Sequence, residues 1–198
     1  MGTAAFIYRS LIDPMLNSSH RSATGFVSTG DRVLDVACGG GTMALMAGEK
    51  AATVIAIDTD TEMIDSARAR AKEKGMGNVD FMEMDATDLS DFEDKEFDLS
   101  IISMAIHQFT LEEGLQVLKE IKRVSKRVVV VDYALPVRRG LYNSLTWLIE
   151  SIAGGDHYRN FKAYMAIGGI YPILAAAGLK VREKHLRGRG TLVINHCD

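Results

Sequence analysis

The sequence predicts an α/β fold, a doubly wound and mostly parallel seven-stranded sheet whose last two strands form an antiparallel hairpin. Through the middle of the 198-residue chain, short runs rich in β-branched residues alternate with helical patterns. Such alternation is typical of parallel strands joined by crossover helices. Near the end, two strand-like runs are separated by a short link that contains glycine. Because so short a link joins only antiparallel strands, the sheet is expected to end in a hairpin.

The parallel part of the sheet is expected to contain strands at residues 32–36, 53–57, 79–84, 97–103 and 127–132. Helices are expected between them at residues 42–50, 61–74 and 111–124. The hairpin strands are expected at residues 179–185 and 191–196, with residues 186–190 as the link. The fifth strand (RVVVVD) is apolar enough to be central in the sheet and buried on both faces.

The segments outside this sheet are expected to cover a ligand crevice. Residues 136–178 are too many for one crossover, so one or two extra helices are predicted there, and another at residues 4–16. Leucine and isoleucine recur at helical spacing in residues 141–152, which fits either a core helix or an apolar lid near lipid headgroups. We interpret 1–198 as a single domain, in which the N-terminal helical segment 1–28 and the insertion 136–178 form a substrate lid.

Bulk properties narrow the class of function. A net charge of −3 gives no electrostatic reason to expect a nucleic-acid partner. Cys38 and Cys197 form no CxxC pair and have no ligand-like spacing to a histidine, so neither a disulfide framework nor a metal site is predicted. No secretory segment or membrane-spanning stretch is apparent. A cytoplasmic protein is therefore expected, with peripheral membrane contact and oligomeric state left open.

Residues 33–42 (VLDVACGGGT) carry the clearest functional signal. A predicted strand runs into the glycine run 39–41, and a helix begins just after it. Glycines at such a joint let the backbone approach a ligand closely, although a plain tight turn is the simpler alternative. Asp58 ends the second strand and Asp85 follows the third. Because ligands of doubly wound sheets lie beyond the carboxyl ends of the strands, Asp35, Asp58 and Asp85 are expected around one crevice.

Two classes of nucleotide ligand fit this pattern. Residues 39–44 match the dinucleotide fingerprint G-x-G-x-x-A, and Asp58 follows Gly39 by nineteen positions, as the ribose ligand of an NAD-dependent oxidoreductase should. Asp35 argues against NAD, because a carboxylate about 4 Å from a pyrophosphate is repelled by several kcal/mol at intermediate dielectric. S-adenosylmethionine instead presents an ammonium and a sulfonium, and Asp85 could accept a hydrogen bond from its adenine. The sequence therefore favours S-adenosylmethionine.

The chain resembles class I S-adenosylmethionine-dependent methyltransferases in five successive segments: VLDVACGGGT, AIDTDTEMIDSARARA, NVDFMEMDATDL, FDLSIISMAIHQF and LKEIKRVSKRVVVVDY. The resemblance covers roughly residues 31–132 and implies a Rossmann-like methyltransferase fold. Within the class, the chain is most similar to the ubiquinone/menaquinone C-methyltransferase-like group. The resemblance implies transfer of a methyl group to a small-molecule acceptor, such as an aromatic or prenylated quinone-like compound. A non-catalytic module that binds S-adenosylmethionine is the alternative.

The resemblance also implies a set of cofactor-binding residues. It assigns the methionine group to Asp35 and the backbone of Ala37, Gly39 and Gly41, the ribose to Asp58, the adenine to Thr59, Met63, Asp85 and Ala86, and a further contact to Ser103. One departure is Ala37, because the family's pattern more often has its first glycine there. Met63 also fits a plain core position by its helical spacing, and Asp60 fits the cap of the helix that follows.

The acceptor side of the site is less constrained by the sequence. A general base helps only if the acceptor is a hydroxyl, a phenol or an acidic carbon. His107, just past the fourth strand, is the candidate base, and the alternative is a histidine at a helix start with no chemical task. Asp132, at the end of the fifth strand, is expected to cap or orient. Substrate contacts are expected from Tyr133, His157, Tyr158 and Arg159.

Overall fold

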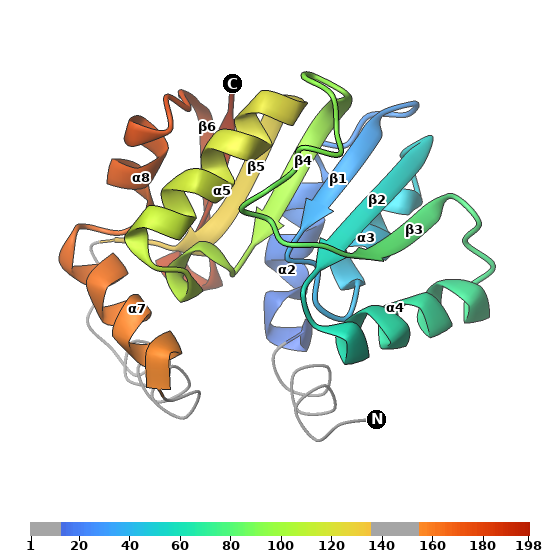
Figure 1. Cartoon of the computed structure of the whole chain (residues 1–198), viewed down its shortest axis with the longest axis horizontal. Coiled ribbons are helices and arrows are strands. Elements are labelled where there is room, and N and C mark those ends of the chain that lie inside the picture. The colour runs from blue at the N-terminus through green and yellow to red at the C-terminus, as the bar shows by residue number, and fades with distance from the viewer. Residues whose placement is uncertain (1–12, 136–154) are drawn as a thin grey trace.

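A single sheet of seven strands organises the computed structural model, which describes residues 13–135 and 155–198 (Figure 1). The strands are β1 Arg32–Val36, β2 Thr53–Asp58, β3 Val79–Glu83, β4 Phe97–Ser103, β5 Ser125–Tyr133, β6 Val181–Arg187 and β7 Leu192–Cys197. Their order is β3-β2-β1-β4-β5-β7-β6, and among them β7 runs antiparallel to both of its neighbours. The predicted fold class, including the terminal hairpin, is confirmed.

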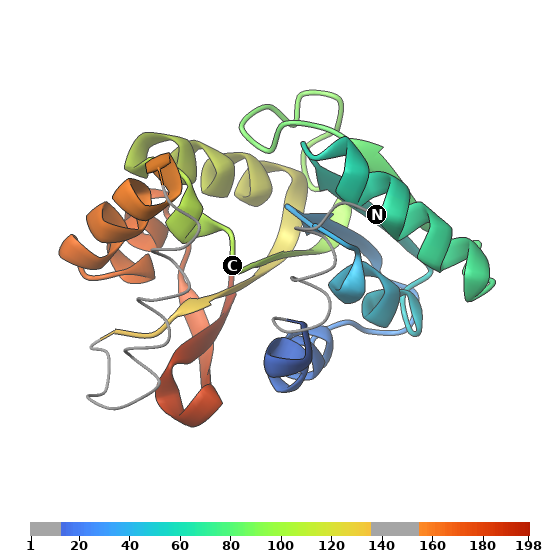
Figure 2. The same cartoon turned by 90° about the horizontal axis from the view of Figure 1, so that it is seen from below.

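Helices cover both faces of this sheet (Figure 2). They are α2 Asp13–Thr24, α3 Thr42–Gly48, α4 Thr61–Glu73, α5 Leu111–Val124, α7 Gly155–Ala166 and α8 Ile170–Ala176, with short 3-10 turns η2 Ile106–Gln108 and η3 Gly188–Gly190. One apolar cluster packs α3 and α4 against the sheet, and a second packs α5, α7 and α8 against the opposite face. None of the helices in the described ranges has the length and apolar character needed to cross a membrane.

The order of the strands indicates which edge of the sheet a ligand would bind. β1 lies between β2 and β4, so the chain leaves β1 in one direction along the sheet and later returns on its other side. Ligands of doubly wound sheets bind at such a switch point, beyond the carboxyl ends of the strands. In Figure 1 the arrowheads of β1 and β4 mark this edge at the bottom of the sheet, and α7 lies beyond it.

Local side-chain chemistry fixes where the helices near this edge begin. The Asp60 carboxylate accepts a hydrogen bond from the Met63 N–H at 3.1 Å and caps α4, which confirms the capping interpretation of Asp60. The α5 helix begins with a capping box. In it, the Thr110 hydroxyl accepts from the Glu113 N–H, and the Glu113 carboxylate accepts from the Thr110 N–H.

Element boundaries differ from the prediction mainly at the N-terminal helix and the hairpin. The described helix α2 begins at Asp13 and ends at Thr24, beyond the predicted end at residue 16, and Leu16, His20 and Ala23 form its buried stripe. The strand β6 extends to Arg187, since Leu186 and Arg187 pair with β7 and shorten the predicted link. Residues 1–12 and 136–154, with the apolar run 141–152, lie outside the described residues.

Candidate functional site

The loop between β1 and α3 has a backbone that favours glycine. Ala37, Gly39 and Gly41 all have positive φ angles, of 55°, 51° and 75°. A Cβ on Gly41 would lie 2.6 Å from Phe81 Cε1 and 2.9 Å from Ala67 Cβ, so no larger residue fits without displacing them. A Cβ on Gly39 would meet nothing within 4 Å. Gly41 is therefore required by the protein's own packing, whereas Gly39 borders open space.

Hydrogen bonds from β2 and α4 hold this loop in place. The Gly39 N–H donates to Asp58 Oδ2 at 2.7 Å, and the Asp60 N–H donates to Asp58 Oδ1 at 3.0 Å. From α4, the Arg70 guanidinium donates to the Gly40 carbonyl and to the Thr42 hydroxyl. This role of Arg70 could not be predicted from the sequence, because an arginine in a helix rich in charges fits a solvated face equally well.

Asp35 is the buried acid of the site. It lies near the end of β1 with 1% of its surface exposed, and its Oδ2 has no hydrogen-bond partner among the described residues. Burial raises the pKa of Asp35 from its ordinary value of 3.8 to about 8; a backbone hydrogen bond from Ala44 opposes the shift, and the Asp58 charge adds to it. A buried carboxyl oxygen without a partner is costly, and such groups are concentrated at binding sites.

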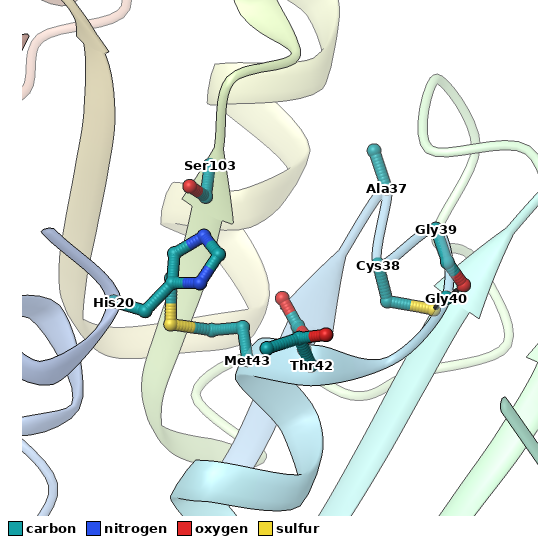
Figure 3. A pocket seen from close by; sticks show the side chains of 9 residues that line it. His20, Ala37, Cys38, Gly39, Gly40, Thr42, Met43 and Ser103 are labelled. Atoms are coloured by element: carbon teal, nitrogen blue, oxygen red, sulfur yellow. Dashed lines mark hydrogen bonds between the residues drawn. The ribbon is translucent and has the colours of Figure 1, made fainter. Parts of the chain in front are cut away.

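Asp35 lines a small pocket together with residues from three further elements. The lining is His20, Asp35, Ala37, Cys38, Gly39, Gly40, Thr42, Met43 and Ser103 (Figure 3). The Ser103 hydroxyl is also buried and without a partner in the described part of the chain. Burial raises the pKa of the Cys38 thiol far above its ordinary range, and the charges of Asp35 and Asp58 reinforce the shift, so the thiol is neutral. The predicted residues Asp35, Ala37, Gly39 and Ser103 thus meet in one place.

A second, more open groove brings together other predicted residues. It has a volume of about 620 Å³, within the usual range for ligand sites, and Thr59 and Asp85 lie in its wall. The remaining lining residues are Thr87, Phe109, Glu112, Glu113, Leu115, Gln116 and Lys119. Asp85 Oδ1 accepts hydrogen bonds from the N–H and the hydroxyl of Thr87, both at 2.8 Å. These bonds fix the carboxylate at the carboxyl end of β3.

Two other predicted adenine contacts lie outside the walls of both pockets. Ala86 is buried in the apolar cluster on the α5 face. Met63 is half-buried and belongs to neither apolar cluster.

His107 and Asp132 form a buried pair at the ends of β4 and β5. His107 Nδ1 lies 2.7 Å from Asp132 Oδ1, and the His107 backbone N–H donates to Asp132 Oδ2 at 3.3 Å. Both side chains are at most 2% exposed. Because a carboxylate at this distance accepts a hydrogen bond, the geometry favours the tautomer with hydrogen on Nδ1. Asp132 therefore orients His107, as the sequence suggested, but His107 itself lies outside the walls of both pockets.

Aromatic rings surround this pair. The His107 ring centroid lies 4.8 Å from Tyr133 and 5.9 Å from His157. Further rings come from Phe161 and Tyr164 on α7, both at 6.1 Å. Two of the four predicted substrate contacts, Tyr133 and His157, therefore gather at His107.

The other two predicted substrate contacts make polar or charged contacts within α7. Tyr158 is half-buried and stacks under the Lys162 ammonium, at 5.1 Å. The exposed Arg159 forms an ion pair with Asp156 at 3.1 Å.

The sequence prediction did not include His20, Thr42 or Met43 among the site residues, and of these His20 lies farthest along the chain from the glycine run 39–41. It comes from α2, which precedes the first strand and lies outside the segments that resemble known motifs. A histidine on a helix with many small polar residues has no distinctive spacing, so only the packing of α2 beside α3, β5 and β7 reveals its place.

Comparisons with known proteins fit this geometry. A family model described as a methyltransferase domain matches residues 33–127. A demethylmenaquinone methyltransferase from Clavibacter sepedonicus is 34% identical over 143 residues, which covers 66% of this chain and 57% of that protein. A demethylmenaquinone methyltransferase from Thermus thermophilus is 31% identical over 171 residues, covering 78% of this chain and 77% of that protein. A methyltransferase from Aquifex aeolicus has a similar structure, with a TM-score of 0.67 at 20% identity over 98% of this chain and 96% of that chain.

These comparisons cover different shares of the proteins and support different conclusions. The chain spans 57%, 42% and 55% of the length of three curated relatives that it matches. The Aquifex structure, at 20% identity, supports the fold alone. The Thermus alignment covers most of both proteins at 31% identity, so it extends well beyond the glycine loop. Together these findings show that the chain belongs to the class I S-adenosylmethionine-dependent methyltransferases and, within them, resembles the ubiquinone/menaquinone C-methyltransferase-like group.

Proposed function

We propose that this protein transfers a methyl group from S-adenosylmethionine to a small apolar acceptor, with aromatic or prenylated quinone-like compounds as the first candidates. The observation that carries the proposal is the buried Asp35 carboxyl, whose Oδ2 has no partner in the described chain and lines the pocket of the glycine loop. A cationic ligand stabilises the ionised form of such a carboxyl, whereas the pyrophosphate of a dinucleotide disfavours its ionisation. This charge preference favours S-adenosylmethionine over NAD.

The residues around the loop fit the parts of this cofactor. Asp35 would receive the ammonium of the methionine group, and the open space in front of Gly39 leaves room for close approach. Each Asp58 oxygen accepts one backbone N–H, which leaves further lone pairs for the ribose hydroxyls. Asp85 would accept from the adenine in the neighbouring groove. When bound, S-adenosylmethionine supplies an electrophilic methyl group on a sulfonium.

The protein's own contribution to the chemistry would be to position the acceptor and to move its proton. With Nδ1–H directed at Asp132, His107 carries its lone pair on Nε2, the atom that would take a proton from a phenol or an acidic carbon. The rings of Tyr133, Phe161 and Tyr164 surround this histidine and would exclude water. Positioning of two reactants alone can lower a barrier by about 7–11 kcal/mol.

The acceptor class is inferred from the relatives and from this apolar wall. Two relatives are named demethylmenaquinone methyltransferases. Asn160 on α7 donates to the Gln108 carbonyl at 2.8 Å, which ties α7 to the turn that carries His107. We infer that α7, as part of the predicted lid 136–178, covers an apolar acceptor; residues 136–154 of that lid lie outside the described structure.

A transfer assay tests this proposal. The protein is incubated with methyl-labelled S-adenosylmethionine and a panel of demethylated quinones with short prenyl chains, and products are identified by mass spectrometry. Labelled quinone is expected, and His107→Ala should reduce its formation without changing affinity for S-adenosylhomocysteine. Binding of nicotinamide cofactors without binding of S-adenosylmethionine would overturn the proposal. Cofactor binding without transfer to any acceptor, in the panel or in a cell extract, would identify a non-catalytic module instead.

A further inference from the structure

His20 reaches into the cofactor pocket from a helix that carries none of the family's motifs. It is 5% exposed and lines the same pocket as Asp35 and Ser103. Figure 3 shows its imidazole beside Ser103, at the end of β4, and Met43, in the first turn of α3. Because α2 packs beside α3, β5 and β7, the helix itself holds the ring at this position.

Without His20, the described side chains that line this pocket would include an acid but none that can carry a positive charge. Asp35 is an acid, the Cys38 thiol is neutral, and the other side chains, such as Thr42 and Ser103, are uncharged. Arg70 donates to the Gly40 carbonyl and is not part of the pocket wall. Among the lining residues that the structure describes, His20 is therefore the side chain that can carry a positive charge.

The ligand that fits such a pair of side chains carries both signs of charge. The methionine group of the cofactor is an α-amino acid, with an ammonium and a carboxylate on one carbon. A pocket containing Asp35 alone would attract the ammonium and repel the carboxylate next to it. A histidine N–H supplies a donor for that carboxylate, and hydrogen bonds to charged groups are about twice as strong as neutral ones.

We propose that His20 donates a hydrogen bond to the α-carboxylate of the methionine group, while Asp35 receives the ammonium. This assignment rests on the proposed function and deepens it, because it makes α2 a specificity element of the cofactor site. The pair would select ligands with an intact amino-acid group over nucleosides that lack the carboxylate. His20 is then a binding residue, and the proposal gives it no part in the proton transfer of the reaction.

Calorimetry with two probes tests the assignment. S-adenosylhomocysteine carries the α-carboxylate, and its decarboxylated analogue S-adenosyl-3-thiopropylamine keeps the amine and lacks only that group. The wild-type protein is expected to bind S-adenosylhomocysteine about ten- to a hundredfold more tightly than the amine. His20→Leu should remove most of this preference by weakening S-adenosylhomocysteine alone, and the Kd of the amine should change less than about threefold.

Matched variants separate this effect from damage to α2. Ser19→Ala alters the adjacent buried position on the same helix but lies outside the pocket wall, so it should keep the full preference. His20→Gln keeps an N–H donor and should keep part of the preference for S-adenosylhomocysteine. This variant also tests the proposal if His20→Leu does not fold. Failure of the wild-type protein to bind either probe would refute the proposed function itself. A preference that survives both His20 changes, or equal weakening of both probes, overturns the role of His20 alone.

Discussion

At the scale of single residues, the site contains backbone strain beside open space. Ala37 and Met104, each just after the end of a strand, both have a φ of 55°, although neither is glycine. A left-handed backbone at a residue other than glycine lowers the stability of the fold. Such residues are concentrated at ligand-binding sites and conformational switches. Ala37 adopts the conformation that a glycine would adopt there. The departure from the family's pattern at this position is therefore compatible with a left-handed backbone.

The two loop glycines should respond differently to alanine. Gly39→Ala adds only left-handed strain and should lower the free energy of unfolding by about 1–2 kcal/mol. Gly41→Ala adds a clash with Phe81 and Ala67 and should cost about 1–3 kcal/mol more. Urea unfolding measures both changes. The new methyl on Gly39 borders the pocket, so Gly39→Ala should also weaken S-adenosylhomocysteine binding in calorimetry. Equal stability losses in the two variants would contradict this division of roles.

At the scale of elements, Asp58 and Asp60 are close in sequence but support different structures. Asp60 caps α4, whereas Asp58 ends β2 and accepts the N–H groups of Gly39 and Asp60. Asp60→Ala should therefore cost about 0.5–2 kcal/mol of stability with little change in cofactor affinity. Asp58→Ala should lower both stability and affinity, since it removes the brace of the loop and the expected ribose acceptor. Thermal unfolding and S-adenosylhomocysteine titration of the two variants provide the measurement.

The opposite result is also informative. If Asp60→Ala weakens cofactor binding as much as Asp58→Ala does, the start of α4 and not the Asp58 carboxylate positions the ribose. If Asp58→Ala loses stability and keeps its affinity, Asp58 is a structural residue.

The sequence predicted the sheet well because each strand carries its own local signal. Runs such as that of β5 are apolar on both faces, and the hairpin has a short glycine-containing link. Residues that act through packing carry no such signal. His20 and Arg70 reach the loop from α2 and α4, and only the tertiary arrangement of those helices reveals their contacts. Asp35, Asp58 and Asp85 could be predicted as site residues because each stands at or near the carboxyl end of a strand. The order of the elements along the chain predicts that these ends meet at one edge of the sheet.

At the scale of the whole molecule, Asp35 makes the free energy of unfolding depend on pH. Its pKa is about 8 in the folded protein and near 3.8 in an unfolded chain. Between these values the folded state binds a proton that the unfolded state does not, so stability falls as the pH rises from about 4 to about 8 and then levels off. Asp35→Asn should lack this decline. Comparing the two proteins cancels shared contributions, including that of His196, whose pKa is lowered by burial.

Cofactor binding should release this proton from the Asp35 carboxyl. Below pH 8 the free protein holds Asp35 largely protonated, whereas the ammonium of a bound methionine group favours the carboxylate. Binding of S-adenosylhomocysteine at pH 6–7 should therefore release about one proton, and the release should vanish above about pH 9. Apparent affinity should rise up to about tenfold per pH unit below pH 8. Calorimetry in buffers of different ionisation enthalpy measures the release directly. Asp35→Asn should release none, and a release that persists in this variant would show that another group, and not Asp35, titrates with the cofactor.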